Sequence, residues 1–186
     1  MPPKPRVTRQ MVLDAAFALV REKGVESLSA RAVAEALGCS TQPVMYNFRT
    51  VEELRDAVYQ MADDFHTRFI MPSDDSAQNP LMELGLNYIR FGAQEPSLFR
   101  FLFQTGRLGG GGIDDLMRDP ENAGLVGMVG EAVGCSPAQA REAFSLLFIT
   151  AHGMASLLAN NAMAYNQQEC ARILALAWAG ALAGKE

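Results

Sequence analysis

Apolar residues recur at spacings of three and four along almost all of this 186-residue chain. That spacing is the period of an amphipathic α-helix, whereas a half-buried β-strand would alternate polar and apolar residues. No sustained alternation interrupts the pattern, and β-branched residues are sparse. The chain is therefore predicted to adopt an all-α fold.

Three short helices are predicted near the N-terminus. The first covers about residues 8–23, and Gly24 follows as its C-terminal cap. Ser29 caps a second helix that Gly38 ends, and Ser40 begins a third helix of about seven residues. Two short helices joined by a tight glycine turn form a helix-turn-helix, whose second helix enters the major groove in DNA-binding proteins. A purely structural hairpin of two helices has the same pattern.

A long fourth helix is predicted to connect this N-terminal part to the rest of the chain. Thr50 and Glu53 have the spacing of a capping box at its start, and the helix extends toward Phe69. We predict a three-helix helix-turn-helix domain over residues 1–50, with an arm over 1–7, and a helical ligand-binding and dimerisation domain over 51–186, with its linking helix over 51–70.

The C-terminal part is predicted to consist of further helices. They span residues 80–94, a short segment after Pro96, residues 137–162 and residues 167–182. In the first of these helices, four side chains are expected to face solvent: Glu83, Asn87, Arg90 and Gln94.

The distribution of charge favours a nucleic-acid partner at the N-terminal end. The net charge is -5, but residues 1–60 hold eight basic and seven acidic side chains, whereas residues 61–186 hold eight and fourteen. Lys4, Arg6 and Arg9 cluster in a Pro-rich arm, where a polyanion is their natural partner. A solvated, disordered arm is the alternative interpretation.

Neither a cofactor nor a metal ion is expected. The cysteines lack the CxxC spacing of a zinc site and lie far apart, at Cys39, Cys135 and Cys170. The glycine-rich segment 105–112 lacks the Gly-Lys-Ser/Thr ending of a phosphate-binding loop. No uninterrupted apolar segment reaches the roughly 18 residues of a membrane span, and none follows the basic residues at the start. We therefore expect a cytoplasmic protein without a membrane partner.

An enzyme is the competing class of function. His66 and His152 are the only two histidines, and neither belongs to a recognisable nucleophile-and-base or metal-ligand pattern. Asp63 and Asp64 lie close to His66, but these three polar side chains are expected on the exposed side of a helix. We therefore expect no enzymatic activity. A small enzyme without a recognisable catalytic constellation and a helical protein-interaction module remain the alternatives.

The strongest functional signal is the segment SARAVAEALGCSTQPVMYNFRTVEEL. It resembles the helix-turn-helix and the start of the linking helix in the TetR (tetracycline-repressor) family of bacterial transcriptional regulators, and the resemblance covers roughly residues 8–60. It implies a homodimer that binds double-stranded operator DNA and, as a repressor, is released by a small apolar effector. Whether such a protein represses or activates depends on the position of its operator.

The resemblance also assigns roles in DNA binding. It implies that Phe48 packs the recognition helix onto the core and that Arg49 holds a phosphate. Met45 stands where the family often has a tyrosine that reaches the DNA backbone, so that contact is either absent or made by Tyr46. The predicted DNA-binding side chains are Ser40, Thr41, Gln42, Tyr46, Arg49 and Arg6.

Two C-terminal segments are similar to one subgroup of the family. AHGMASLLAN at 151–160 is similar to a Trp/Ala-His-Gly segment, and PSLFRFLFQT at 96–105 fits the same subgroup. The resemblance points to this Trp-His-Gly subgroup without identifying a ligand.

An apolar effector pocket is predicted in the C-terminal domain. Phe144, Phe148 and His152 lie at i, i+4 and i+8, so they share one helix face, and His152 adds a titratable group to an aromatic row. The effector should be small and largely apolar. A core is the alternative interpretation of such a row, with His152 simply hydrogen-bonded. The predicted lining is Phe99, Phe103, Phe144, Phe148, His152 and Met128, with Met117 nearby.

A homodimer interface is predicted on the last two helices. Two sides of the final helix are apolar, so its own chain can cover only part of it. Small residues would let two copies approach closely in an isologous contact. A final helix buried entirely within its own chain is the alternative. The predicted interface residues are Met154, Leu158, Ile173, Ala177, Gly180 and Ala181.

Overall fold

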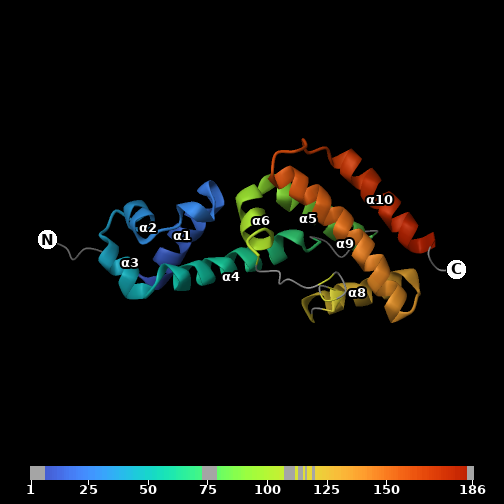
Figure 1. The fold of residues 1–186 in the computed structure, drawn as a ribbon, viewed down its shortest axis with the longest axis horizontal. Helices are drawn as coiled ribbons and strands as arrows, with labels where there is room; N and C mark the ends of the chain where they lie inside the picture. Colours follow the sequence, from blue (N-terminus) through green and yellow to red (C-terminus); the bar gives the residue numbers. More distant parts are fainter. Residues whose placement is uncertain are drawn as a thin grey trace. The chain divides into compact units, whose positions relative to one another are not determined.

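The computed structural model describes residues 7–72, 79–106, 112, 115, 117, 118 and 120–183, without the side chains of residues 120, 121 and 182. Regular structure in these ranges is helical throughout, so the all-α prediction is confirmed (Figure 1). The elements are α1 (Arg9–Lys23), the short 3-10 helix η1 (Val25–Ser27), α2 (Ala30–Ala36), α3 (Thr41–Asn47), α4 (Val51–Ile70), α5 (Pro80–Gln94), α6 (Pro96–Phe103), α8 (Pro120–Val133), α9 (Pro137–Ala159) and α10 (Gln167–Ala183).

The chain divides into two compact units. The first comprises the residues up to Thr67 together with Ser97–Gln104, and the second comprises Arg68–Pro96 and the residues from Thr105 onward. The predicted domain boundary at residue 50 is a division by function, whereas the compact division falls inside α4.

Packing explains why most of α4 belongs to the first unit. Its residues Leu54, Val58 and Ala62 are almost completely buried, at the helical spacing of four. Phe65 packs edge-on against Phe17 of α1, with ring centroids 5.8 Å apart. Most of the linking helix α4 therefore belongs to the N-terminal unit.

The first helices begin and end where their capping residues predict. Thr8 accepts a hydrogen bond from the Met11 amide through its side chain, and Ser29 does the same for Ala32. Gly24 ends α1 with a φ of 86°, a conformation that favours glycine. The predicted positions of α1, α2 and α3 are confirmed, whereas η1 between α1 and α2 was not expected.

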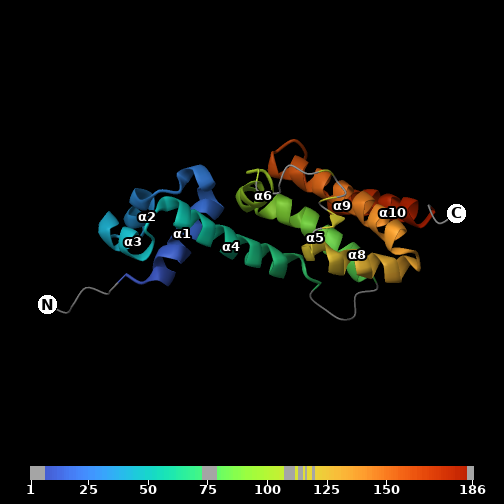
Figure 2. The same cartoon turned by 60° about the horizontal axis from the view of Figure 1, so that its bottom comes forward.

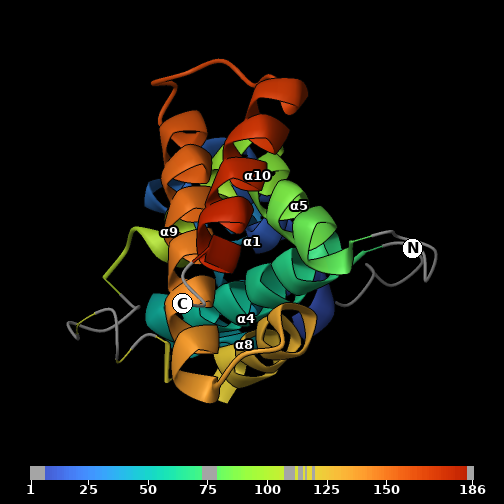
Figure 3. The same ribbon diagram turned by 90° about the vertical axis from the view of Figure 1, so that its right-hand side faces the viewer.

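In the second unit, α9 is the central helix. It packs against α5, α8 and α10, and α10 also contacts α5. Figures 2 and 3 show α5, α9 and α10 running alongside one another. A capping box begins α9, because the side chains of Ser136 and Gln139 each bond the other's backbone amide. By length and composition α9 could cross a membrane, but three helices pack along it, as expected for the core helix of a helical body.

Helix α8 was not predicted from the sequence. Gly124, Gly127 and Gly130 interrupt its apolar pattern, and glycine is a poor helix former. Tertiary packing overrides that preference, because Val129 and Val133 are buried in the core that α8 shares with α9.

The expectation that Asn87 faces solvent was wrong. Its side chain is 8% exposed, and its amide nitrogen donates to the carbonyl oxygen of Ile70 at 3.2 Å. Ile70 is the last residue of α4, where carbonyl groups have no partner within the helix. Asn87 therefore satisfies a buried helix end, which a pattern of hydrophobicity cannot reveal.

Helices α5 and α9 approach closely at Gly92. A Cβ atom at this position would lie 2.6 Å from the carbonyl oxygen of Ala155 and 2.8 Å from its Cα atom. These are backbone atoms, so neither can move aside without shifting α9. The close packing of the two helices thus requires glycine at residue 92.

We expect Gly92→Ala to lower the free energy of unfolding by about 1–3 kcal/mol, because it overpacks the α5–α9 contact. Gly124→Ala is the matched control, since a Cβ atom there meets nothing within 4 Å. That control should raise stability by about 0.5–1 kcal/mol through helix propensity. Urea denaturation followed by circular dichroism measures both variants. Equal or increased stability of Gly92→Ala would contradict close packing at this position.

Candidate functional site

Helix α3 has one buried face and one exposed face. Val44, and Phe48 directly after the helix, are each 1% exposed and anchor it to the first unit. On the other side Tyr46 is 77% exposed and Met45 is 38% exposed. The predicted DNA-binding residues that the structure describes are all exposed: Ser40, Thr41, Gln42, Tyr46 and Arg49. Arg6 lies outside the described residues.

A tight turn sets the angle between α2 and α3. Gly38 has a φ of 62°, and its amide donates to the carbonyl of Glu35 at 3.1 Å. The amide of Cys39 donates to the carbonyl of Ala34 at 3.0 Å. These two bonds form a Schellman motif, which closes the end of α2. Ser40 then takes the N-cap position of α3 with its side chain making no capping bond, which leaves an exposed hydroxyl at the tip of the helix.

The beginning of the described chain is attached to the end of α3. The side-chain amide of Asn47 donates to the carbonyl oxygen of Val7 at 3.3 Å and to that of Pro43 at 2.8 Å. Residue 7 therefore lies beside α3.

A polar cluster lies where α3 meets α4. The guanidinium carbon of Arg9 lies 4.2 Å from the ring centroid of Phe48, and its Nη2 atom lies 3.9 Å from Glu53 Oε1. The other carboxylate oxygen, Oε2, accepts a hydrogen bond from the Arg49 amide at 2.8 Å. The Glu53 amide donates to the Thr50 hydroxyl at 3.0 Å. The predicted capping box is thus half formed, because the carboxylate bonds Arg49 in place of the N-cap residue.

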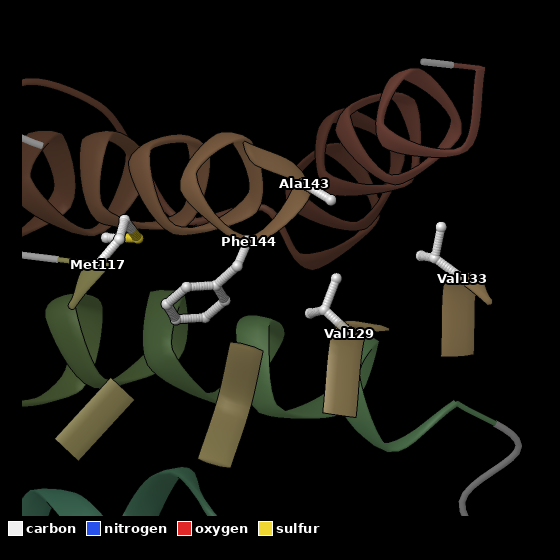
Figure 4. Packing of buried hydrophobic residues seen from close by; sticks show 5 residues of the cluster. All are labelled: Met117, Val129, Val133, Ala143 and Phe144. Atoms are coloured by element: carbon white, nitrogen blue, oxygen red, sulfur yellow. The ribbon is translucent and has the colours of Figure 1, made fainter. Parts of the chain in front are cut away.

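The predicted ligand-lining residue Phe144 belongs to the core of the second unit. Its side chain is 7% exposed and points from α9 between Met117 and Val129 (Figure 4). The buried cluster consists of Met117, Val129, Val133, Ala143 and Phe144. Of the two interpretations of the aromatic row, the core applies at this position.

The rest of the predicted aromatic row forms a stack of two rings with a hydrogen-bonding group at one end. Phe148 and His152 lie nearly parallel, with ring centroids 5.5 Å apart, and Tyr88 Oη lies 2.8 Å from His152 Nδ1. Burial raises the pKa of Tyr88 and lowers the pKa of His152. Both groups are therefore neutral at pH 7, and the bond joins a phenol to an imidazole.

Phe99 and Phe103 belong to the other unit. Their ring centroids are 5.0 Å apart, and Phe103 lies 5.1 Å from the ring of His66. The predicted pocket set is thus divided, with Phe99 and Phe103 in the first unit and Phe144, Phe148, His152 and the exposed Met128 in the second.

The expectation that His66 is solvated was wrong. Its side chain is 7% exposed, and burial lowers its pKa to about 4. Burial and the nearby charge of Asp64 raise the pKa of Asp63. Within the part of the chain that the structure describes, no group of three His, Cys, Asp or Glu residues is arranged to hold a metal ion.

The second unit contains a hollow of about 600 Å³ between α8 and the start of α9. Met117, Val126 and Ala140 are apolar residues on its wall, and Arg118 and Arg141 bring two positive charges to it. The remaining lining residues are Ala123, Gly127, Gly130, Glu131, Cys135 and Pro137. Met117, predicted near the pocket, is part of this lining, whereas none of the six predicted lining residues is. The hollow is broadly open to solvent.

Sequence reasoning missed this hollow because it missed α8. Gly127 and Gly130 line the hollow without side chains. The same glycines interrupt the apolar spacing by which α8 could have been predicted. The run of glycines in an otherwise apolar segment was the available signal.

Two predicted dimer residues are covered by their own chain. Met154 and Leu158 are each 6% exposed, so they offer little surface to a second copy. α5 and α10 both pack against α9, the helix that carries these two residues. Gly180 is exposed, and Ile173, Ala177 and Ala181 are half-buried. The large exposed apolar side chains of these two helices are instead Leu146, Ile149, Leu157 and Leu176.

The helix-turn-helix has a match among known families. Residues 12–58 match the family described as "Bacterial regulatory proteins, tetR family". The match contains all of α2 and α3, so the predicted resemblance is confirmed for the N-terminal domain. The Trp-His-Gly subgroup stays a prediction. No curated protein sequence matches the chain significantly.

Solved structures resemble the fold over nearly the whole chain. A tetR-family transcriptional regulator from Streptomyces coelicolor aligns with a TM-score of 0.69 at 20% identity, covering 99% of this chain and 85% of that one. A TetR-like transcriptional regulator from Rhodococcus sp. RHA1 gives 0.66 at 20% identity, covering 98% and 100%. The multidrug binding protein EbrR, complexed with imidazole, gives 0.55 at 22% identity, covering 91% and 88%. The predicted fold, a helix-turn-helix domain followed by a helical body, is confirmed.

Proposed function

We propose that this chain is a DNA-binding transcriptional regulator, proceeding from the match of residues 12–58 to the tetR family of bacterial regulatory proteins. The observation that carries the proposal is the exposed surface of α3, where Thr41, Gln42 and Tyr46 are accessible while Val44 and Phe48 are buried. A helix held in this way can place its first residues against base edges in a major groove. Fold likeness to regulators supports the same interpretation.

A cytoplasmic protein without catalytic activity is part of the proposal. Bacterial DNA is in the cytoplasm, and the fold relatives named above are described as regulators. Fold alone does not determine function, so the exposed surface of α3 is the feature that favours DNA binding. An interaction module that uses the helix-turn-helix structurally would lack salt-dependent affinity for DNA.

We expect Arg49→Ala and Gln42→Ala to separate phosphate binding from base recognition. Arg49→Ala should weaken binding to all duplexes and flatten the dependence of log K on log salt by about 0.9, the value for one phosphate contact. Gln42→Ala should relax base preference, with a loss of about 1–3 kcal/mol on the preferred sequence. Fluorescence anisotropy at several salt concentrations, with a duplex selected from a random pool, measures both. If Arg49→Ala changes sequence preference without changing the salt slope, these roles are wrong.

A homodimer is the proposed functional state. Leu146, Ile149 and Leu157 are between 43% and 54% exposed along α9, and Leu176 of α10 is 61% exposed. Four large apolar side chains on two neighbouring helices suit a self-complementary contact between two copies. Two recognition helices per dimer would meet half-sites one helical turn of DNA apart, about 34 Å.

Ile149→Glu and Leu176→Glu should each convert the dimer to a monomer. Both side chains are exposed within one chain, so the monomer fold should survive, whereas burying an unpaired carboxylate at the interface should weaken association by about 3 kcal/mol, over a hundredfold. The matched control is Arg172→Glu, since Arg172 is a charged, exposed residue of α10. Light scattering at micromolar concentration measures the mass. A dimeric mass for both apolar variants would contradict the proposed interface.

The hollow between α8 and α9 is the proposed effector site. Arg118 and Arg141 outnumber Glu131 on its wall, and Met117 and Val126 supply apolar surface. An organic anion with an apolar body fits that combination. A ligand complex of one fold relative, EbrR with imidazole, supports small-molecule binding in this type of fold.

Gly127→Leu should block effector binding by filling the hollow. A Cβ atom at Gly127 meets nothing within 4 Å, so the substitution should not disturb the fold. Gly124→Leu is the matched control, because Gly124 lies on the same helix with the same open surroundings but outside the lining. In a thermal-shift screen of fatty acids and aromatic carboxylates, a hit should stabilise the wild type and the control and release their DNA, but leave Gly127→Leu unchanged. An equal shift in Gly127→Leu would place the effector elsewhere.

A further inference from the structure

Glu53 is bound to two parts of the candidate DNA surface at once. Its Oε2 atom accepts from the Arg49 amide at 2.8 Å, and its Oε1 atom lies 3.9 Å from the guanidinium of Arg9. Its own amide is held by the Thr50 hydroxyl. One carboxylate in the first turn of α4 thus reaches both the start of α1 and the segment that follows α3.

The guanidinium of Arg9 is held in place but not covered. It lies over the ring of Phe48, and the Arg9 side chain is 56% exposed. An arginine has five N–H donors, so one long contact with Glu53 leaves most of them able to bind a phosphate. The buried ring below Arg9 is the anchor of α3, so Arg9 lies next to the recognition helix.

We propose that Glu53 is a positioning residue for DNA binding, which holds the Arg9 guanidinium and the Arg49 backbone so that both arginines meet phosphates. The inference rests on the proposed function, since it concerns the same DNA surface. It assigns Arg9 a phosphate contact and gives Glu53 a role opposite to the one its charge would suggest.

The charge of Glu53 and its contacts predict opposite effects on DNA affinity when the residue is neutralised. A carboxylate near a phosphate backbone weakens DNA binding through repulsion, so neutralising it should strengthen binding. If Glu53 positions the two arginines, neutralising it should instead weaken binding. The sign of the change therefore decides between the two.

Glu52 is a matched control for this test. It is the preceding residue, it is exposed, and it belongs to the same acidic first turn of α4. It takes part in none of the contacts described for Glu53. Glu52→Gln and Glu53→Gln therefore remove the same charge from the same helix end, and their difference reports the contacts.

The experiment measures binding of the full chain to a labelled duplex of about 30 base pairs, long enough for two half-sites, that the wild type has selected from a random pool. We expect Glu52→Gln to bind as tightly as the wild type or a few-fold more tightly. Glu53→Gln should bind about tenfold more weakly than Glu52→Gln. Its slope of log K against log salt should be lower by about 0.9 for each phosphate that the variant no longer binds.

A second variant separates positioning from folding. Arg9→Gln leaves the bond between Glu53 and Arg49 in place and should lower the salt slope by about 0.9. Adding Glu53→Gln to Arg9→Gln should cost less than it does in the wild type, because part of its effect passes through Arg9. Circular dichroism at the binding temperature checks that each variant is folded.

The results of these binding measurements distinguish a failure of the proposed function from a failure of the role proposed for Glu53. If the wild type selects no duplex, the proposed function fails. If the wild type binds but Glu52→Gln and Glu53→Gln have the same affinity and the same salt slope, the positioning role of Glu53 is wrong. If Arg9→Gln leaves the salt slope unchanged, Arg9 makes no phosphate contact.

Discussion

The burial of Val44 and Phe48 is the constraint on which the candidate DNA-binding surface depends. Val44 is buried within α3 and Phe48 is buried directly after it, so both hold the helix against the first unit. Thr41, Gln42 and Tyr46 remain exposed on the same helix. Arg9 completes the anchor, because its guanidinium covers the Phe48 ring and keeps a cation beside the helix.

The second unit depends on close approach along α9. Gly92 has no side chain where α5 crosses Ala155, and the same part of α5 carries the buried Tyr88 and Asn87. Tyr88 meets His152 by a hydrogen bond between two neutral groups. A polar pair packed among aromatic rings is stable because its two groups hydrogen-bond each other, so this row is a structural element of the second unit.

Local signals in the sequence predicted most of the fold, and tertiary contacts explain the rest. Helix starts at Thr8, Ser29 and Ser136 depend on bonds within three residues, so they can be recognised from sequence. The burial of Asn87 and His66 depends on partners from distant segments, and sequence spacing placed both in solvent. The exposure of the candidate DNA-binding residues was predictable from the family resemblance of the helix-turn-helix. The hollow was not predictable, because glycines form part of its wall and leave no side-chain pattern in the sequence.

Helix α4 begins in the first unit and ends in the second, with the division at Thr67. A regulator of the proposed kind must couple DNA binding in one unit to ligand binding in the other. That coupling is a free energy shared by both events, so a ligand that weakens DNA binding tenfold must itself bind tenfold more weakly to the DNA complex. Such coupling requires no contiguous pathway between the two sites. It requires two states that differ in ligand affinity, because a ligand that binds both states equally would leave the DNA-binding surface unchanged.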